Sequence, residues 1–322
     1  MKLHRLLPLV VLVVGVALDA PAQVCSPDAP LRRTLAVNVL DQQGNLVRGL
    51  TASDFRGEFR GQPVKIVSAT PDTNPRRIVV LLDASASMTG NRNHWELGLR
   101  AARDMAAFAP SGSSVALMLF ASKVIKKTEF SKGEQILADE MESLGDGYEA
   151  PENLRRTALI DAMVEGIRLL EPPTVGDAMY VIGDGGDNKS QTRYRAMEQM
   201  LFASGIRMFA FGIFDPIAER GMPELVWGPS MLHDTAVNTA GAWIAVEGIG
   251  FNEEKLKELG AIARRMYEQM AEFYRVDMEL PVGVSKPQGW KLEVVDSKGK
   301  RRKDVEVIYP RKLVPCAAAP TP

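Results

Sequence analysis

A series of short apolar runs, bounded by turn-forming or charged residues, begins near position 78 of the chain. Runs of this kind are typical of strands buried on both faces of a sheet. We expect strands over residues 78–82, 114–120, 178–182, 206–213 and 242–246. Helical periodicity occupies the intervals, and strands that alternate with helices predict an α/β fold: an open, mostly parallel sheet with helices on both faces.

Three of the intervals place apolar residues three or four positions apart, on one helical face. The stripes are Trp95, Leu99, Ala102 and Ala106; Leu159, Met163, Ile167 and Leu170; and Leu256, Leu259, Ala263, Met266, Met270 and Phe273. We interpret all three, including the methionine-rich last one, as helix faces packed on the sheet.

Both flanks of this region alternate apolar and polar residues, which predicts strands rather than helices. Residues 34–66 contain a Gly44-Asn45 turn signal, and residues 69–75 read as a linker. Residues 124–130 resemble an exposed edge strand, because two lysines discourage pairing with another sheet. Strands are expected again at 274–280 and after 290. The basic run at 298–303 reads as a hairpin tip, with a patch for anionic surfaces as the alternative.

These patterns divide the chain into a leader at 1–22, an N-terminal β segment and linker at 23–74, an α/β domain at 75–275, a C-terminal β segment at 276–316 and a disordered tail at 317–322. Because β segments flank the α/β domain on both sides, we expect them to pair with each other in a small accessory β unit.

The leader has the three parts of a secretory signal peptide. Lys2 and Arg5 precede an apolar run that ends near Leu18, and Ala20 and Ala22 stand in A-x-A spacing. We expect cleavage after Ala22 and a secreted, periplasmic or cell-surface protein. An uncleaved membrane anchor is the alternative, but the run is shorter than the roughly 18 to 20 residues that a spanning helix needs. No later segment is apolar enough to span a bilayer.

The composition, 46% hydrophobic and 25% charged, is that of a globular protein. Cleavage would remove Lys2, Arg5 and Asp19 from 39 basic and 40 acidic residues, which leaves 37 and 39 and a net charge near −2. This balance argues against nucleic acid as the main partner.

The exported chain keeps two cysteines, Cys25 and Cys316, at its opposite ends. In an oxidising compartment they could form a bridge that ties the termini together, or they could remain unpaired in the terminal segments.

Small oxygen-bearing side chains follow several of the expected strands. Asp83 ends the first strand of the α/β domain, with Ser85 and Ser87 at the next alternate positions; Thr157 starts a predicted helix, and Asp184 follows a strand in a glycine-rich turn. In an open parallel sheet, ligands bind outside the carboxyl ends of the strands, where the loops converge. We therefore expect these five side chains to meet at one rim.

Each signal taken alone has a simpler explanation. The two serines could cap the helix that contains Trp95, the threonine could cap its own helix, and Asp184-Gly185 could be an ordinary turn. Asp187 and Asn188, which lie near the same rim, are interpreted as turn residues.

In combination, the five residues resemble the metal ion-dependent adhesion site of von Willebrand factor type A domains, with its Asp-x-Ser-x-Ser turn, later threonine and Asp-Gly aspartate. The resemblance covers roughly residues 77–274 and implies a Rossmann-like sheet. The flanks resemble β segments of a bacterial secreted subgroup of this family, most clearly in "VLDQQGNLVRGLTASDF" and around Gly289-Trp290-Lys291. Many relatives carry threonine or serine before the second aspartate, where this chain has Gly183.

The resemblance implies a site for Mg²⁺ or Mn²⁺, with Ser85, Ser87 and Thr157 as direct ligands and Asp83 and Asp184 acting largely through water. Such ions prefer about six oxygen ligands. An Asp or Glu carboxylate of a partner protein would complete the shell, so the resemblance implies a secreted, non-enzymatic protein-binding or adhesion module. A structural or assembly role, in which the metal only locks the loops, is the alternative. The resemblance also implies a shift of the last helix on ligand binding.

A serine hydrolase is a less favoured alternative. It would need Ser85 or Ser87 as nucleophile with His94 or His233 as base, yet nothing in the sequence orients either histidine and no G-x-S-x-G elbow is present. We expect His94 at the surface of a helix start and His233 at a helix boundary. Clustered Cys/His zinc ligands and a phosphate-binding glycine loop are absent from the sequence.

Overall fold

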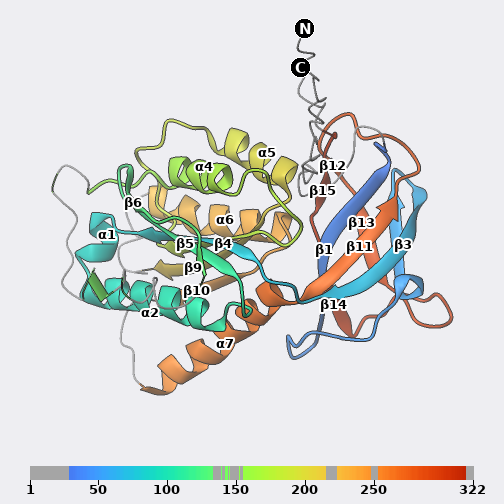
Figure 1. Cartoon of the computed structure of the whole chain (residues 1–322), viewed down its shortest axis with the longest axis horizontal. Coiled ribbons are helices and arrows are strands. Elements are labelled where there is room, and N and C mark those ends of the chain that lie inside the picture. The colour runs from blue at the N-terminus through green and yellow to red at the C-terminus, as the bar shows by residue number, and fades with distance from the viewer. Residues whose placement is uncertain are drawn as a thin grey trace, which may run out of the picture.

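The computed structural model describes residues 29–132, 139, 142–143, 145, 152, 155–214, 223–247 and 253–316. Figure 1 shows two lobes side by side, one built of helices and strands and the other of strands alone. The expected leader, Cys25 and the tail at 317–322 lie outside the described residues, whereas Cys316 is described and is disulfide-bonded. Within the described part of the chain, no helix has both the length and the apolar character needed to cross a membrane.

The α/β lobe is built on a sheet that has seven strands among the described residues, in the order β10-β9-β8-β4-β5-β6, with β7 also paired to β5. The strands are β4 (Arg77–Asp83), β5 (Ser114–Phe120), β6 (Val124–Lys127), β7 (Ser131–Lys132), β8 (Ala178–Gly183), β9 (Arg207–Phe214) and β10 (Trp243–Glu247). β4, β5, β8, β9 and β10 pair in parallel, and β6 and β7 pair antiparallel to β5. All five predicted core strands and the predicted edge strand are present, but β10 is a half-exposed edge strand instead of a buried one, and β6 ends at Lys127 instead of residue 130.

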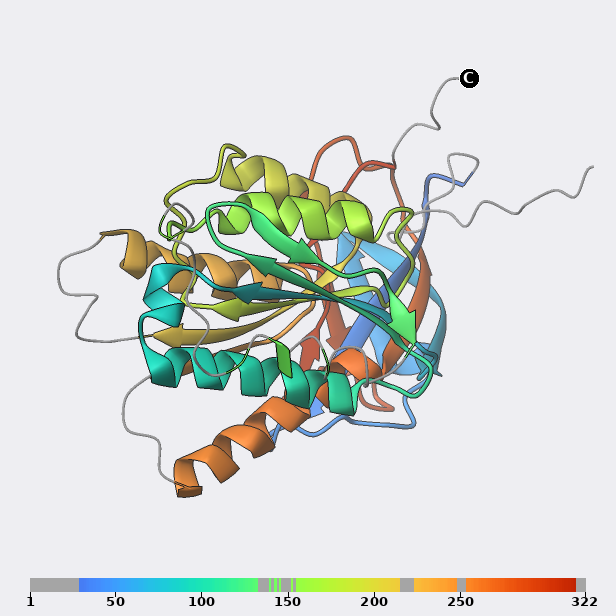
Figure 2. The ribbon, with the colours of Figure 1, turned by 60° about the vertical axis from the view of Figure 1, so that its left-hand side comes forward.

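Helices cover both faces of this sheet, as Figure 2 shows. They are α1 (Ala86–Thr89), α2 (Arg92–Phe108), α4 (Leu159–Leu169), α5 (Tyr194–Ser204), α6 (Pro223–Asn238) and α7 (Glu253–Ala271). The apolar side chains of α2 and α7 form one core with one face of the sheet. Those of α4, α5 and α6 form a second core on the other face.

Three expectations about the helices were wrong. Phe273, placed last in the stripe of the final helix, is the first residue of a strand. His94 is buried in the first turn of α2, with 5% of its surface exposed, instead of lying at the surface. His233 lies inside α6 and not at a helix boundary.

The second lobe is a curled antiparallel sheet in the order β13-β2-β3-β11-β1-β14. Its strands are β1 (Arg32–Asp41), β2 (Phe55–Phe59), β3 (Gln62–Asp72), β11 (Phe273–Glu279), β13 (Lys291–Val294) and β14 (Val305–Ile308). A short 3₁₀ turn (Ala52–Asp54) precedes β2. In a separate two-stranded sheet, β12 (Gln288–Gly289) pairs with β15 (Lys312–Leu313). β1 lies between β11 and β14, so the N- and C-terminal segments pair as predicted. The expected linker at 69–75 is shorter, because β3 continues to Asp72.

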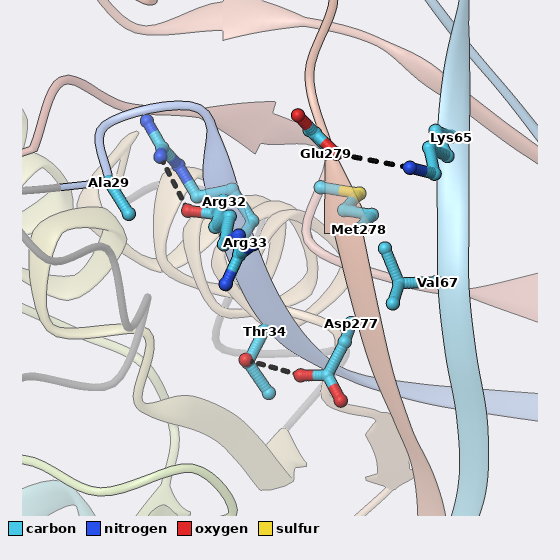
Figure 3. A pocket seen from close by; sticks show the side chains of 9 residues that line it. All are labelled: Ala29, Arg32, Arg33, Thr34, Lys65, Val67, Asp277, Met278 and Glu279. Atoms are coloured by element: carbon cyan, nitrogen blue, oxygen red, sulfur yellow. Dashed lines mark hydrogen bonds and ion pairs between the residues drawn. The ribbon is translucent and has the colours of Figure 1, made fainter.

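A hollow of about 520 Å³ lies on the outer face of β1, β11 and β3 in this lobe. Figure 3 shows Asp277 accepting a hydrogen bond from Thr34 within it, and Lys65 paired with Glu279 at its border. The hydroxyl of Ser68 also donates to Asp277, at 2.6 Å. Asp277 is thus held by hydroxyls from both neighbouring strands.

A buried arginine joins the two lobes. Arg207, at the start of β9, is 1% exposed and donates to Ala240 O, Gln269 O and the side chain of Asn38. Its guanidinium also lies over the ring of Phe273, 5.1 Å from the ring centre. Burial lowers the pKa of Arg207 to about 9, so the group keeps its charge at neutral pH. One cation therefore bonds to β1 of the β lobe and to the end of α7.

The last carbonyls of α7 are satisfied from the same region. A helix leaves its final carbonyl groups without partners in the helix. Arg207 donates to Gln269 O at 2.8 Å, Arg76 to Ala271 O at 3.4 Å, and Asn38 to Glu272 O at 2.7 Å. The C-terminal end of α7 is consequently fixed between the lobes.

We predict that Arg207→Met lowers the free energy of unfolding by at least about 3 kcal/mol, because three buried oxygen acceptors lose their donor. Arg195→Met, at an exposed position of α5, is the control and should change it by less than about 0.5 kcal/mol. Urea denaturation followed by circular dichroism measures both, and equal losses in the two variants would contradict the assigned role of Arg207.

Candidate metal centre

Asp83 is the last residue of β4 and begins a tight polar loop. Its carboxylate accepts a hydrogen bond from the backbone N–H of Ser85 at 2.8 Å. The hydroxyls of Ser85 and Ser87 lie 3.0 Å apart. α1 follows directly, and Figure 1 places it at the end of the α/β lobe that faces away from the β lobe. The three residues thus lie together where β4 ends.

The serines do not cap the helix that contains Trp95. That helix, α2, is capped by Asn91, whose side chain accepts from the Asn93 N–H. Ser85 stands at the N-cap of the short α1 without a side-chain capping bond. The capping explanation for the serines is therefore wrong, and their hydroxyls are directed at each other.

Asp184 enters the same rim from the neighbouring strand. It follows β8, which pairs in parallel with β4, and its carboxylate accepts from the Gly186 N–H at 2.8 Å. Asp83 is 1% exposed and Asp184 is 5% exposed. Burial raises the pKa of Asp83 well above its usual range, the charge of Asp184 raises it further, and the hydrogen bond from Ser85 opposes both. Two carboxylates therefore repel each other where little water screens them.

Gly183 explains how the two aspartates fit side by side. A Cβ atom at position 183 would lie 2.7 Å from the Cβ of Asp83 and 3.0 Å from its Oδ2. The space that a serine or threonine would occupy in many relatives is filled here by the Asp83 side chain. The glycine is thus a steric requirement of this rim.

Thr157 is held beside this pair by the loop that precedes α4. The Ala86 N–H donates to Arg155 O at 3.0 Å, which joins this loop to the serine turn, and the Ala158 N–H donates to Ala121 O at 2.7 Å beyond the end of β5. Thr157 is buried, with 4% of its surface exposed. It is not the N-cap of α4, because Ala158 occupies that position.

Two residues interpreted from sequence as turn residues make contacts across the rim. Asn188 accepts from the Thr157 N–H, and Asp187 accepts from the Ile160 N–H in the first turn of α4. Their nearness to Asp184 was visible in "GDGGDN", but their partners are about thirty residues away in sequence and could not be read from it.

The arrangement offers oxygen ligands of the kinds that suit a hard divalent cation. Two carboxylates would balance its charge, and Ser85, Ser87 and Thr157 add neutral hydroxyls. Among the described residues, no group of three His, Cys, Asp or Glu side chains is placed to hold a metal. All five rim side chains offer oxygen atoms, which suit Mg²⁺ or Mn²⁺ better than a metal that prefers nitrogen or sulfur.

Comparison with known proteins was made at the level of sequence families and of solved structures. Residues 78–186 match the family model of the von Willebrand factor type A domain. No match is found among curated proteins. One solved structure with a similar backbone is that of BatB from Bacteroides thetaiotaomicron, which is 18% identical in sequence. The alignment covers 61% of this chain and 98% of that chain, with a TM-score of 0.46.

A von Willebrand factor type A protein from Catenulispora acidiphila is similar at 13% identity, with 88% of this chain and 75% of that chain covered and a TM-score of 0.48. The family model spans the rim from Asp83 through Thr157 to Asp184. The chain therefore carries a von Willebrand factor type A domain, matched over residues 78–186.

Proposed function

We propose that this chain is an exported protein-binding module that engages a carboxylate of its partner through a divalent cation, Mg²⁺ or Mn²⁺, at the rim of Asp83, Ser85, Ser87, Thr157 and Asp184. Domains of this family are commonly protein-interaction modules. A bound divalent ion would supply the positive charge that offsets both aspartates and an open position for an oxygen of the partner.

The observation that carries the proposal is the buried pair Asp83 and Asp184 beside the serine turn, in which Ser87 is exposed to solvent. Burial of two like charges costs free energy that a cation between them would offset. Ser87, in contrast to Ser85, is exposed. A ligand on the serine side of the rim is thus accessible to another molecule.

The alternative, in which a metal serves only to lock the loops, is less well supported. Hydrogen bonds of the protein itself join these loops, from the Ala86 N–H to Arg155 O and from the Thr157 N–H to the Asn188 side chain. A metal lock would add to contacts that the chain already makes. The carboxylate pair, however, is a feature that a bound cation would compensate.

Binding is also favoured over hydrolysis. The Ser85 hydroxyl is hydrogen-bonded to Ser87 and to Asp83, and His233 is paired with Asp234 inside α6. We propose that the module performs no catalysis. An unchanged rate of ester hydrolysis after Ser85→Ala would agree with this, and loss of a measurable rate would contradict it.

We predict that Asp83→Asn abolishes the response to divalent ions. With chelator, the variant should be at least as stable as the wild type, because one of two repelling charges is gone while the acceptor for the Ser85 N–H remains. With Mg²⁺ or Mn²⁺ at 100 times the dissociation constant, the wild type should gain about 2.7 kcal/mol and the variant almost nothing.

Thermal and urea unfolding with and without chelator measure this difference. Asp234→Asn, at an exposed position with 64% of its side chain accessible, is the matched control and should keep the full response. A wild-type protein whose stability is the same in chelator and in saturating Mn²⁺ would refute the proposed site.

A second prediction concerns Gly183→Ala. The added methyl group would lie 2.7 Å from the Cβ of Asp83, which cannot rotate away, so β4 and β8 must separate. We expect a loss of about 1 to 3 kcal/mol in unfolding free energy and a smaller stabilisation by divalent ions. Gly260→Ala is the control, because nothing lies within 4 Å of its added methyl and α7 should gain stability.

A third prediction tests partner binding itself. The immobilised chain should retain proteins in Mg²⁺ that chelator elutes, and the Asp83→Asn chain should retain none of them. The locking alternative predicts the same bound proteins for both chains and in both buffers. Mass spectrometry of the four eluates separates the two outcomes.

A further inference from the structure

The loop after β8 continues past Asp184 with polar residues that point toward the start of α4. Asp187 is only partly exposed, and Ser190 likewise. A solvated turn would direct such side chains to water. Here each of them bonds to backbone or side-chain groups of the segment 157–161.

Asn188 holds the backbone of Thr157 on both sides. Its side-chain oxygen accepts from the Thr157 N–H at 3.1 Å, and its own N–H donates to the Thr157 carbonyl at 3.0 Å. Fixing both peptide groups that flank a residue sets the direction of its Cα–Cβ bond. Only the rotation about that bond is then left to place the Thr157 hydroxyl.

A second set of hydrogen bonds joins the same loop to the start of α4. We call these bonds, together with those of Asn188, the brace. The Asp187 carboxylate accepts from the Ile160 N–H at 2.8 Å and from the Ser190 hydroxyl at 2.6 Å. The Ser190 hydroxyl oxygen in turn accepts from the Asp161 N–H at 3.0 Å. Asp161 completes the exchange by accepting from the N–H groups of the next two loop residues, Gln191 and Thr192, both at 2.9 Å.

Asp187 takes the place of a missing helix cap. Ala158 stands at the N-cap of α4 and has no side-chain oxygen to satisfy the first N–H groups. The capping oxygen therefore comes from the loop that also carries Asp184. This arrangement makes the start of α4 and the loop after β8 parts of one unit.

We infer that Asn188 is a positioning residue of the divalent site, with Asp187 in support: together they fix the Thr157 hydroxyl relative to the Asp184 carboxylate. This inference rests on the proposed function. It assigns a role to two side chains that are not themselves ligands. Without the brace, an ion would have to order two independent loops as it binds, and its affinity would fall.

A purely structural role for Asn188 predicts something different. Loss of a structural hydrogen bond lowers stability equally with and without the ion. Loss of a positioning bond weakens the ion's affinity while the metal-free protein remains folded. Asn188 is exposed, so its truncation leaves no cavity in either core.

The test is a titration of the mature chain with Mn²⁺ by isothermal calorimetry, using the wild type, Asn188→Ala and Asn188→Asp. We expect Asn188→Ala to bind Mn²⁺ at least tenfold more weakly, the size of effect typical of residues that orient metal ligands. Its melting temperature in chelator should stay within a few degrees of the wild type. Asn188→Asp keeps the acceptor for the Thr157 N–H and should bind within about threefold of the wild type.

The matched control is Asn45→Ala, in the β lobe. Asn45 is also an exposed turn asparagine whose backbone N–H and side chain both bond to a neighbour, Asp41, at 2.8 and 3.1 Å. Its truncation should leave the Mn²⁺ affinity unchanged. Hydrogen exchange at the Thr157 amide gives a second, metal-free measurement: faster exchange in Asn188→Ala than in Asn188→Asp is expected.

Two results would overturn the inference, and they are distinguishable. If the wild type binds Mn²⁺ and Asn188→Ala binds it within twofold, with unchanged exchange at Thr157, the site exists but Asn188 does not position it. If the wild type itself takes up no Mn²⁺, the proposed function fails and the inference fails with it.

Discussion

The repulsion between two carboxylates at the ends of adjacent parallel strands is the constraint around which this rim is built. Asp83 and Asp184 are both nearly inaccessible, and the Asp83 side chain fills the space beside position 183, which carries no side chain of its own. A buried pair of like charges is tolerated only where something else offsets it. The neighbouring hydroxyls, the backbone N–H donors and the exposed edge at Ser87 are consistent with a cation in that role.

A buried charge of the opposite sign, which is also offset by its neighbours, lies at the other end of the α/β lobe. Arg207 is a buried cation, and three oxygen acceptors together with the face of Phe273 surround it. Its acceptors come from β1, from the segment before β10 and from the end of α7. One charge at the start of β9 therefore organises the joint between the lobes, whereas Asp83 is at the other end of the parallel strands, as the last residue of β4.

The sequence was sufficient to predict the sheet because buried parallel strands are almost uniformly apolar, and to predict the rim because parallel strands end on one side. It was not sufficient where one residue type serves two purposes. Asn188 looks the same whether it closes a turn or holds Thr157, because that choice depends on a segment about thirty residues away.

The spacing from Met270 to Phe273 suits a helix, yet the chain becomes a strand there. α6 was missed because Pro229 lies inside it and its apolar residues are not confined to one face.

The joint between the lobes also bears on the last-helix shift that the resemblance implied. A sliding of α7 along its axis would have to break the bonds from Arg207, Arg76 and Asn38 to its final carbonyl groups. It would also pull on β11, which follows α7 directly and is paired on both sides, with β1 and β3. Tyr267, about one turn before the end of the helix, adds a hydrogen bond to Ala101 O in α2. Motion of α7 is therefore least costly as a pivot about its C-terminal end, which these bonds fix against the β lobe.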